Sequence, residues 1–177
     1  SRADVSVMTH HGFHGGIATC LLVYSLLEGT TEFDMNRLEI TKTRFGDAIS
    51  EIIAGQAWGS MDITEPNAGS DMGAITTRGE QDSEGNWFVT GEKTFITSGH
   101  GKYHLVVART EPRSEDDEIM SGVKGLSLFL VRAYSEDAAG ARIAHAAVER
   151  IEEKIGHHSS PTCTIRFDRS PAELIGR

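Results

Sequence analysis

The sequence predicts an α+β protein, in which a short helical segment precedes a domain of β-strands that form an antiparallel barrel or sandwich. Apolar residues recur at helical spacings up to Gln56, and after that point the hydrophobic pattern repeats every second residue. The strands expected there are short, regularly spaced and separated by turn residues, which is typical of barrels and sandwiches. We therefore divide the chain into residues 1–57 and residues 58–177.

The helical part contains two candidate segments. Residues 16–29, GIATCLLVYSLLEG, are apolar on nearly all sides, which suits a buried helix that ends at Gly29. In residues 34–56, Asp34 is the expected N-cap and apolar residues again recur at helical spacings. Gly46 weakens the middle of this segment, so two shorter helices are the alternative. The apolar residues of this second segment are Leu38, Phe45, Ile49, Ile52 and Ile53.

The β part contains a hairpin connection and a long acidic loop. The connection, DSEGN, occupies residues 82–86 and carries Gly85, which turns tightly without steric cost. The acidic stretch at residues 111–124 has no periodicity and is expected to be a mobile loop. Strands are predicted at residues 58–64, 76–81, 87–93, 94–98, 104–109, 125–131, 142–155 (with an interruption) and 162–167.

The composition excludes several classes of function. The net charge of −9 argues against nucleic acid or an anionic membrane as the main partner, because both require clustered Lys and Arg. No segment approaches the run of about 20 apolar residues that a membrane span needs. The two cysteines, Cys20 and Cys163, do not make a disulfide framework, so a reducing cytoplasm is the expected location. Both ends read as mid-protein sequence, and we expect a fragment of a longer protein.

Common cofactor and metal motifs are missing. No G-x-G-x-x-G follows a predicted strand, so a Rossmann dinucleotide site is unsupported, and GHGKY at residues 99–103 lacks the final Ser or Thr of a P-loop. His10, His11 and His14 could approach one another on a helix, but glycines surround them and no carboxylate completes a set of ligands. We expect histidines that lie on the surface or pack between helices, and no metal site.

The stretch MDITEPNAGSDMG, residues 61–73, predicts a tight polar turn directly after a strand. Pro66 fixes its own φ and pushes Glu65 towards an extended conformation. Gly69 tolerates left-handed backbone angles, and Ser70 can bond to neighbouring amides. Several backbone N–H groups are then left facing outward. The turn is either a plain connection or a nest of amides that binds an anionic group.

The stretch TGEKTFITSG, residues 90–99, offers a second candidate surface. If it is extended, Phe95 and Thr97 project to one face and Ile96 projects to the other. An aromatic ring beside a hydroxyl suits a planar heteroaromatic cofactor, which would stack on the ring and bond to the hydroxyl at one edge. The alternative is a half-buried strand with Phe95 in the core.

Taken together, these segments resemble the acyl-CoA dehydrogenase family. ITEPNAGSD, TGEKTFITSG, HLVVART, GLSLFLV and EKIGHHSSPTCTIRFD follow in the family's order and spacing, and the resemblance covers nearly the whole chain. It implies that residues 1–57 end the N-terminal helical domain, that residues 58–177 form the central β-domain, and that the C-terminal helical domain is absent. The segment GHHSSPTC is most similar to the branch that includes methylmercaptopropionyl-CoA dehydrogenases.

The resemblance implies FAD as the cofactor. In the family the Thr-Glu-Pro turn and its flanks line FAD, so Met61, Ile63 and Thr64 would lie along the isoalloxazine ring. Gly69 and Ser70 would lie near the pyrophosphate, and Ser70 would also approach the CoA chain of the substrate.

The second segment is similar to the Trp-Ile-Thr motif of the family, which implies that Phe95, Ile96 and Thr97 also contact FAD. In the family the Thr hydroxyl bonds near flavin N5, and the aromatic side chain packs against the ring. Phe95 replaces the commoner Trp, so stacking is kept and the indole N–H is lost.

The reaction that the resemblance implies is α,β-dehydrogenation of an acyl-CoA thioester, with electrons passed to electron-transfer flavoprotein or another acceptor. In the family the base is a Glu of the C-terminal helical domain, so no catalytic residue is assigned in this chain. Glu65 has a structural place in the motif and is not taken as the base. The family also implies a homo-oligomer for the full-length protein. The alternatives are an acyl-CoA oxidase or flavin monooxygenase on the same fold, or a non-catalytic binding domain.

Overall fold

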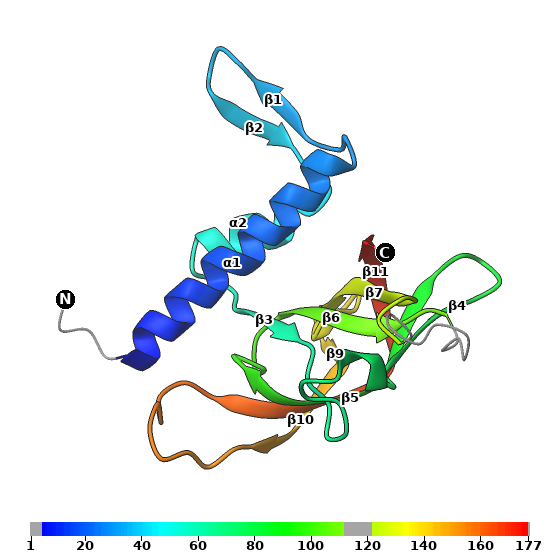
Figure 1. Ribbon diagram of the computed structural model, residues 1–177. Coiled ribbons are helices and arrows are strands. Elements are labelled where there is room, and N and C mark those ends of the chain that lie inside the picture. Colours follow the sequence, from blue (N-terminus) through cyan, green and yellow to red (C-terminus); the bar gives the residue numbers. More distant parts are fainter. Residues whose placement is uncertain (1–4, 112–121, 177) are drawn as a thin grey trace.

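The computed structural model describes residues 5–111 and 122–176, so most of the predicted mobile loop lies outside the described residues. The long helix α1 (Val5–Leu27) runs beside the β-domain, and the shorter helix α2 (Gly46–Ile53) packs against it (Figure 1). The chain leaves α1 near Gly29, as predicted, because a φ of +69° lets the Gly29 N–H bond to Leu26 O at 3.0 Å. No helix within the described ranges is long and apolar enough to span a membrane.

The prediction of a helix that begins at Asp34 is wrong. The first half of that segment belongs to a β-hairpin that projects beyond the end of α1 (Figure 1). The Asp34 carboxylate accepts the N–H groups of Asn36 (2.8 Å) and Arg37 (3.2 Å), and it thereby closes the turn of the hairpin instead of capping a helix. Only the part from Gly46 onward is helical, as α2. The hairpin strands are β1 (Glu32–Asp34) and β2 (Glu39–Lys42).

The predicted strands lie near the observed ones, with three differences, and the short strand β8 (Tyr134–Glu136) was not predicted. The strands predicted at residues 87–93 and 94–98 form one continuous strand, β5. The interrupted strand at residues 142–155 is divided into β9 and β10, and the last strand continues to Gly176. The bounds are β3 (Gly59–Asp62), β4 (Arg78–Gln81), β5 (Trp87–Thr97), β6 (Tyr103–Arg109), β7 (Leu126–Arg132), β8 (Tyr134–Glu136), β9 (Arg142–Ala144), β10 (Ala146–Ile151) and β11 (Thr162–Gly176), with a 3₁₀ turn at Met72–Ala74.

The main sheet is mixed, so the prediction of a purely antiparallel domain is wrong. β5, β4, β6, β7 and β11 pair in that order, and β11 pairs again with β5, which closes a ring of paired strands. β3 pairs with β6 in parallel, with Ser60 opposite His104, and Arg78 of β4 is opposite Arg109 of β6 in a second parallel pairing. Parallel pairing of β3 and β6 is possible because β4 and β5 lie between them in the chain and provide a long crossover.

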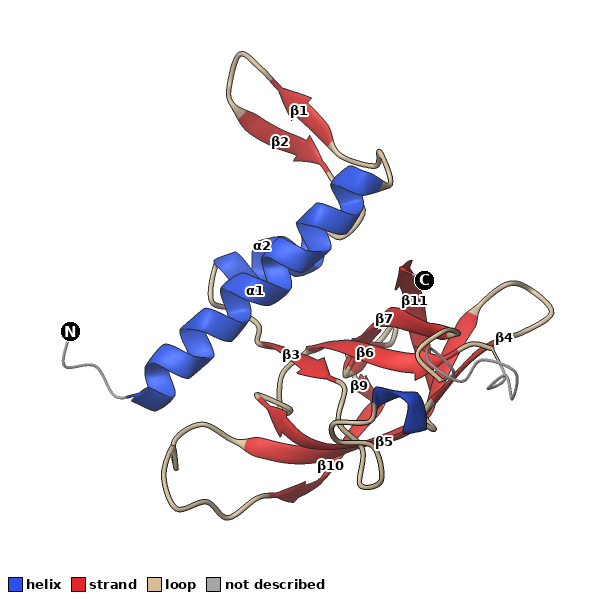
Figure 2. Cartoon of the chain, in the orientation of Figure 1, coloured by secondary structure: helices blue, strands red, loops and turns tan. Residues whose placement is uncertain are grey.

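The core consists of two buried clusters, one within the ring of strands and one between the helices and the sheet. One consists of side chains from the ring of strands, including Val89, Val106 and Phe129. In the other, Tyr103 and Leu105 of β6 pack with the apolar side chains of α1 and α2. Successive residues of β6 therefore alternate between the two clusters. This arrangement places α1 against one face of the sheet, next to β3 (Figure 2).

Candidate functional site

The Thr-Glu-Pro segment forms a tight turn in which Glu65 and Ala68 exchange two backbone hydrogen bonds of 3.1 Å each. These two amides therefore do not face outward, contrary to the expectation for the turn as a whole. The exposed Asn67, Gly69 and Ser70 donate no backbone hydrogen bond to any residue that the structure describes. The amides that remain available to an anionic group are thus at the tip of the turn and just after it.

The side chain of Glu65 is buried and fully bonded within the protein. Its carboxylate accepts the Thr76 N–H (2.8 Å), the Thr76 hydroxyl (2.7 Å), the Thr77 N–H (3.0 Å) and the ammonium group of Lys93 (2.8 Å). Burial alone would raise the pKa of Glu65, but these hydrogen bonds and the charge of Lys93 lower it to about 2. Glu65 is therefore a structural carboxylate, in agreement with the interpretation of the sequence.

Lys93 joins the Thr-Glu-Pro turn to strand β5. Its ammonium group bonds to Glu65 and also donates to Ile63 O at 2.9 Å. The backbone N–H of the next residue, Thr94, donates to Thr64 O at 2.8 Å. The two segments that the sequence singles out therefore lie side by side. Sequence reasoning missed Lys93, although a lysine within an otherwise strand-like pattern is the signal that could have identified a buried ion pair.

The residues of the second segment face in different directions. Phe95 is 62% exposed, with a left-handed φ of +59°, so the alternative that places it in the core does not hold. Thr97 is half-buried, and its hydroxyl has no hydrogen-bond partner among the residues that the structure describes. Ile96 lies in the core of the strand ring and is 2% exposed, so its side chain is unavailable to a ligand and only its backbone can contribute.

The predicted residues before the turn differ in their exposure. Met61 is 48% exposed, while Ile63 and Thr64 are half-buried. A hollow of about 580 Å³ has Pro66 of the turn and Phe95 of β5 in its wall, whereas Met61, Ile63, Thr64 and Thr97 do not line it. An exposed aromatic ring, a free hydroxyl and free amides on joined segments suit a planar ligand that also carries an anionic group. The other residues that line the hollow are Glu92, Thr94, Glu149, Arg150 and Thr164.

Residues 60–170 match the family model described as the acyl-CoA dehydrogenase middle domain. The chain belongs to the acyl-CoA dehydrogenase family.

Curated relatives of this acyl-CoA dehydrogenase chain are much longer than the chain itself. The broad-specificity linear acyl-CoA dehydrogenase FadE5 of Mycobacterium tuberculosis is 37% identical over 126 residues, which cover 66% of this chain and 20% of that protein. The 3-methylmercaptopropionyl-CoA dehydrogenase of Ruegeria pomeroyi is 32% identical over 135 residues, which cover 72% of this chain and 22% of the relative. The chain thus spans about a fifth of the length of these relatives.

Solved structures support the fold along almost the whole chain. Caenorhabditis elegans ACDH-11, solved in complex with C11-CoA, superposes with a TM-score of 0.69 at 22% identity. The superposition covers 96% of this chain and 26% of that one. The acyl-CoA dehydrogenase fold therefore includes the helical part of the chain as well as the β-domain.

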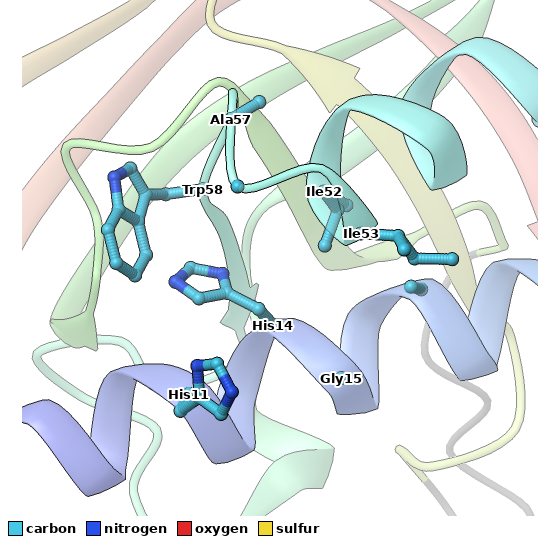
Figure 3. Close-up of a pocket in the computed structure, with 9 residues that line it drawn as sticks. His11, His14, Gly15, Ile52, Ile53, Ala57 and Trp58 are labelled. Carbon is cyan, nitrogen blue, oxygen red and sulfur yellow. The ribbon is translucent and has the colours of Figure 1, made fainter.

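A cluster of histidines lies on α1 and contacts Trp58, just before β3. Figure 3 shows His11 and His14 beside Trp58, at a hollow of about 340 Å³ between α1 and α2. His10 and His14 are buried, and their ring centroids lie 4.9 Å and 3.8 Å from that of Trp58. These two histidines pack α1 against the β-domain. No three His, Cys, Asp or Glu side chains converge as a metal site in the part of the chain that the structure describes.

His14 is held as a neutral imidazole. Its Nδ1 accepts the Gly59 N–H at 3.2 Å, so the single ring proton is on Nε2. Burial, and then the positive charges that His10, His11 and His100 can carry, lower the pKa of His14 from 6.5 to about 4. Protonation of Nδ1 would also break the bond from Gly59.

Acid is expected to destabilise the protein through His14. The unfolded chain protonates this residue below pH 6.5 and the folded chain only near pH 4, so the unfolded state binds more protons between these values. The free energy of unfolding should fall by up to about 3 kcal/mol as the pH drops through this window, less the share that solvent screening removes. Denaturant titrations at several pH values measure this decline.

The matched comparison uses His14→Phe and, as a control at an exposed position, His158→Phe. His14→Phe should show a weaker decline of stability with falling pH than the unmodified protein, whereas His158→Phe should not change it. Equal pH dependence in all three proteins would show that His14 titrates normally in the folded state.

Proposed function

We propose that this chain forms one wall of the flavin site in an FAD-dependent acyl-CoA dehydrogenase, and that the full-length protein catalyses α,β-dehydrogenation of an acyl-CoA thioester. The observation that carries the proposal is the joined surface in which exposed Phe95 and the free hydroxyl of Thr97 lie on a strand bonded to the Thr-Glu-Pro turn. The closed ring of paired strands supports a barrel-type central β-domain over residues 58–177. The α1–α2 pair supports residues 1–57 as the end of the N-terminal helical domain.

The residues at this surface fit FAD. The exposed ring of Phe95 is available for packing against a flavin, and the hydroxyl of Thr97 is available to an atom at the flavin edge. The free amides of Gly69 and Ser70 suit the pyrophosphate. When bound, FAD supplies the hydride acceptor for the reaction. The side chains proposed to flank the isoalloxazine are those of Met61, Ile63 and Thr64, and Ile96 contributes its backbone.

The residues of this chain bind and orient, and they do not remove the α-proton of the substrate. Glu65 is already bonded to Thr76, Thr77 and Lys93, and a carboxylate with a pKa of about 2 is a weak base. We therefore assign proton removal to a carboxylate elsewhere in the full-length protein. The exposed Ser70 is assigned to the CoA chain of the substrate.

The proposed partners follow from this reaction. The substrate is an acyl-CoA thioester, and the electrons leave the flavin for electron-transfer flavoprotein or another acceptor. Exposed apolar side chains on α1 and the hairpin, such as Met8, Leu27 and Phe33, support a homo-oligomer of the full-length protein. Cys20 and Cys163 are both free thiols, which supports a cytoplasmic location.

The proposed reaction is tested by mixing the full-length protein, loaded with FAD, with acyl-CoA thioesters of different chain lengths in the absence of oxygen. The visible absorption band of the flavin should bleach as the flavin is reduced, and the α,β-unsaturated product should appear in equal amount. Bound FAD that no acyl-CoA reduces would contradict the proposal. Reoxidation by oxygen in preference to electron-transfer flavoprotein would identify an oxidase instead.

Substitutions in β5 test the assignment of the flavin wall. Thr97→Val keeps the shape of the side chain and removes one hydrogen bond, so FAD affinity should fall about 2- to 10-fold, with a shift of the flavin spectrum. Phe95→Ala should weaken FAD binding by about tenfold or more, because it removes the aromatic ring that is proposed to pack against the flavin. Thr41→Val in the distant hairpin is the matched control. Unchanged flavin affinity and spectrum in both β5 variants would refute the assignment.

A further inference from the structure

The segment Phe95–Ser98 has an unusual backbone. Phe95 has a φ of +59° and Ser98 has a φ of +60°, so two non-glycine residues in the left-handed region enclose Ile96 and Thr97. This conformation is unfavourable for residues with a β-carbon, and it persists only where the surrounding structure holds it in place. The contacts at each end of the segment should therefore determine where the Phe95 ring and the Thr97 hydroxyl point.

The start of the segment is held by the β-domain itself. The N–H of Thr94 donates to Thr64 O at 2.8 Å, and Ile96 is buried in the core of the strand ring. The backbone at the other end is also fixed, because the Ser98 N–H donates to Pro161 O at 2.9 Å. These contacts fix the path of the chain, but they leave the fully buried Ser98 side chain to be satisfied from elsewhere.

That partner comes from helix α1. Nδ1 of His10 lies 2.9 Å from the Ser98 hydroxyl, and the two groups share a hydrogen bond whose donor depends on the tautomer of His10. His10 is only 8% exposed, and its ring packs edge-on against Trp58 at 4.9 Å. The backbone carbonyl of Trp58 accepts the N–H groups of Lys102 (2.9 Å) and Tyr103 (3.1 Å), so the residue against which His10 packs is anchored to the start of β6.

We propose that His10 is a positioning residue for the flavin wall: through Ser98 it holds Phe95 and Thr97 in the orientation in which they face the cofactor. This inference rests on the proposed flavin site. It makes α1 part of the flavin-binding machinery, although α1 contributes none of the residues assigned to contact FAD. Displacement of α1 would release Ser98 and let the strained segment relax, which couples the helical part of the chain to the cofactor.

The test uses the full-length protein with His10→Phe, which keeps an aromatic ring against Trp58 and removes the nitrogen that bonds to Ser98. His11→Phe, at the exposed neighbouring position, is the matched control. In the flavin-free protein, the NMR signals of the Thr97 methyl group and the Ser98 amide should move in His10→Phe and stay in place in His11→Phe. FAD affinity should fall about 3- to 10-fold in His10→Phe only, as expected for one lost hydrogen bond.

Two variants of Ser98 approach the same bond from the other side. Ser98→Ala removes the hydroxyl without any change in α1, and it should move the Thr97 signal in the same direction as His10→Phe, which keeps the test valid if His10→Phe does not fold. Ser98→Gly introduced into His10→Phe should restore part of the lost FAD affinity, because glycine adopts a φ of +60° without strain and leaves no buried hydroxyl unbonded. A contact that serves only to stabilise the fold would not show this rescue.

The proposal is overturned if His10→Phe and Ser98→Ala leave the Thr97 signal and FAD affinity at the values of the control. It is also overturned if Ser98→Gly worsens the FAD affinity of His10→Phe. A different result would show that the proposed flavin site is wrong: Thr97→Val and Phe95→Ala would then leave FAD binding unchanged. The NMR signals of the flavin-free protein would still report on the contact between His10 and Ser98.

Discussion

The buried ion pair between Glu65 and Lys93 is the interaction on which the candidate site depends. Their side chains are 4% and 0% exposed, and their charged groups lie 2.8 Å apart. Removal of one partner from such a pair typically costs about 3–5 kcal/mol, because the other charge is left buried without compensation. The other partners of the Glu65 carboxylate are Thr76 and Thr77, just before β4, and the other partner of Lys93 is Ile63 O. The loop after β3, the residues that lead into β4 and strand β5 therefore form one unit.

The same ion pair shows that Glu65 has a structural role and is not a catalytic base. A carboxylate next to the proposed flavin site invites assignment as a catalytic base, but the bonds that lower the pKa of Glu65 to about 2 also occupy its lone pairs. The groups left free nearby are of another kind: the ring of Phe95, the hydroxyl of Thr97 and the amides of Gly69 and Ser70. Such groups pack and donate hydrogen bonds, which are the properties needed to hold and orient a cofactor.

Features set by local periodicity could be predicted from the sequence, and features set by long-range pairing could not. Alternation along an extended chain predicts that Phe95 and Thr97 are separated from Ile96, and the burial of Ile96 agrees, although the left-handed φ of Phe95 could not be predicted this way. The hairpin after α1 was missed because Asp34 can accept backbone amides equally well in a turn and at the start of a helix. The parallel pairing of β3 with β6, the ion pair of Glu65 and the bond from His10 to Ser98 all join residues far apart in the chain, and no local pattern encodes them.

The central claim is that the ion pair holds the two halves of the flavin wall together, and calorimetric titration of FAD into the flavin-free full-length protein tests it most directly. The unmodified protein would be compared with Glu65→Gln, Lys93→Met and the double variant. The account predicts that each single substitution weakens FAD binding and that the double variant loses less than the two singles added together, because no unpaired charge remains buried. FAD affinities that stay unchanged in folded single variants, or losses that simply add, would contradict it.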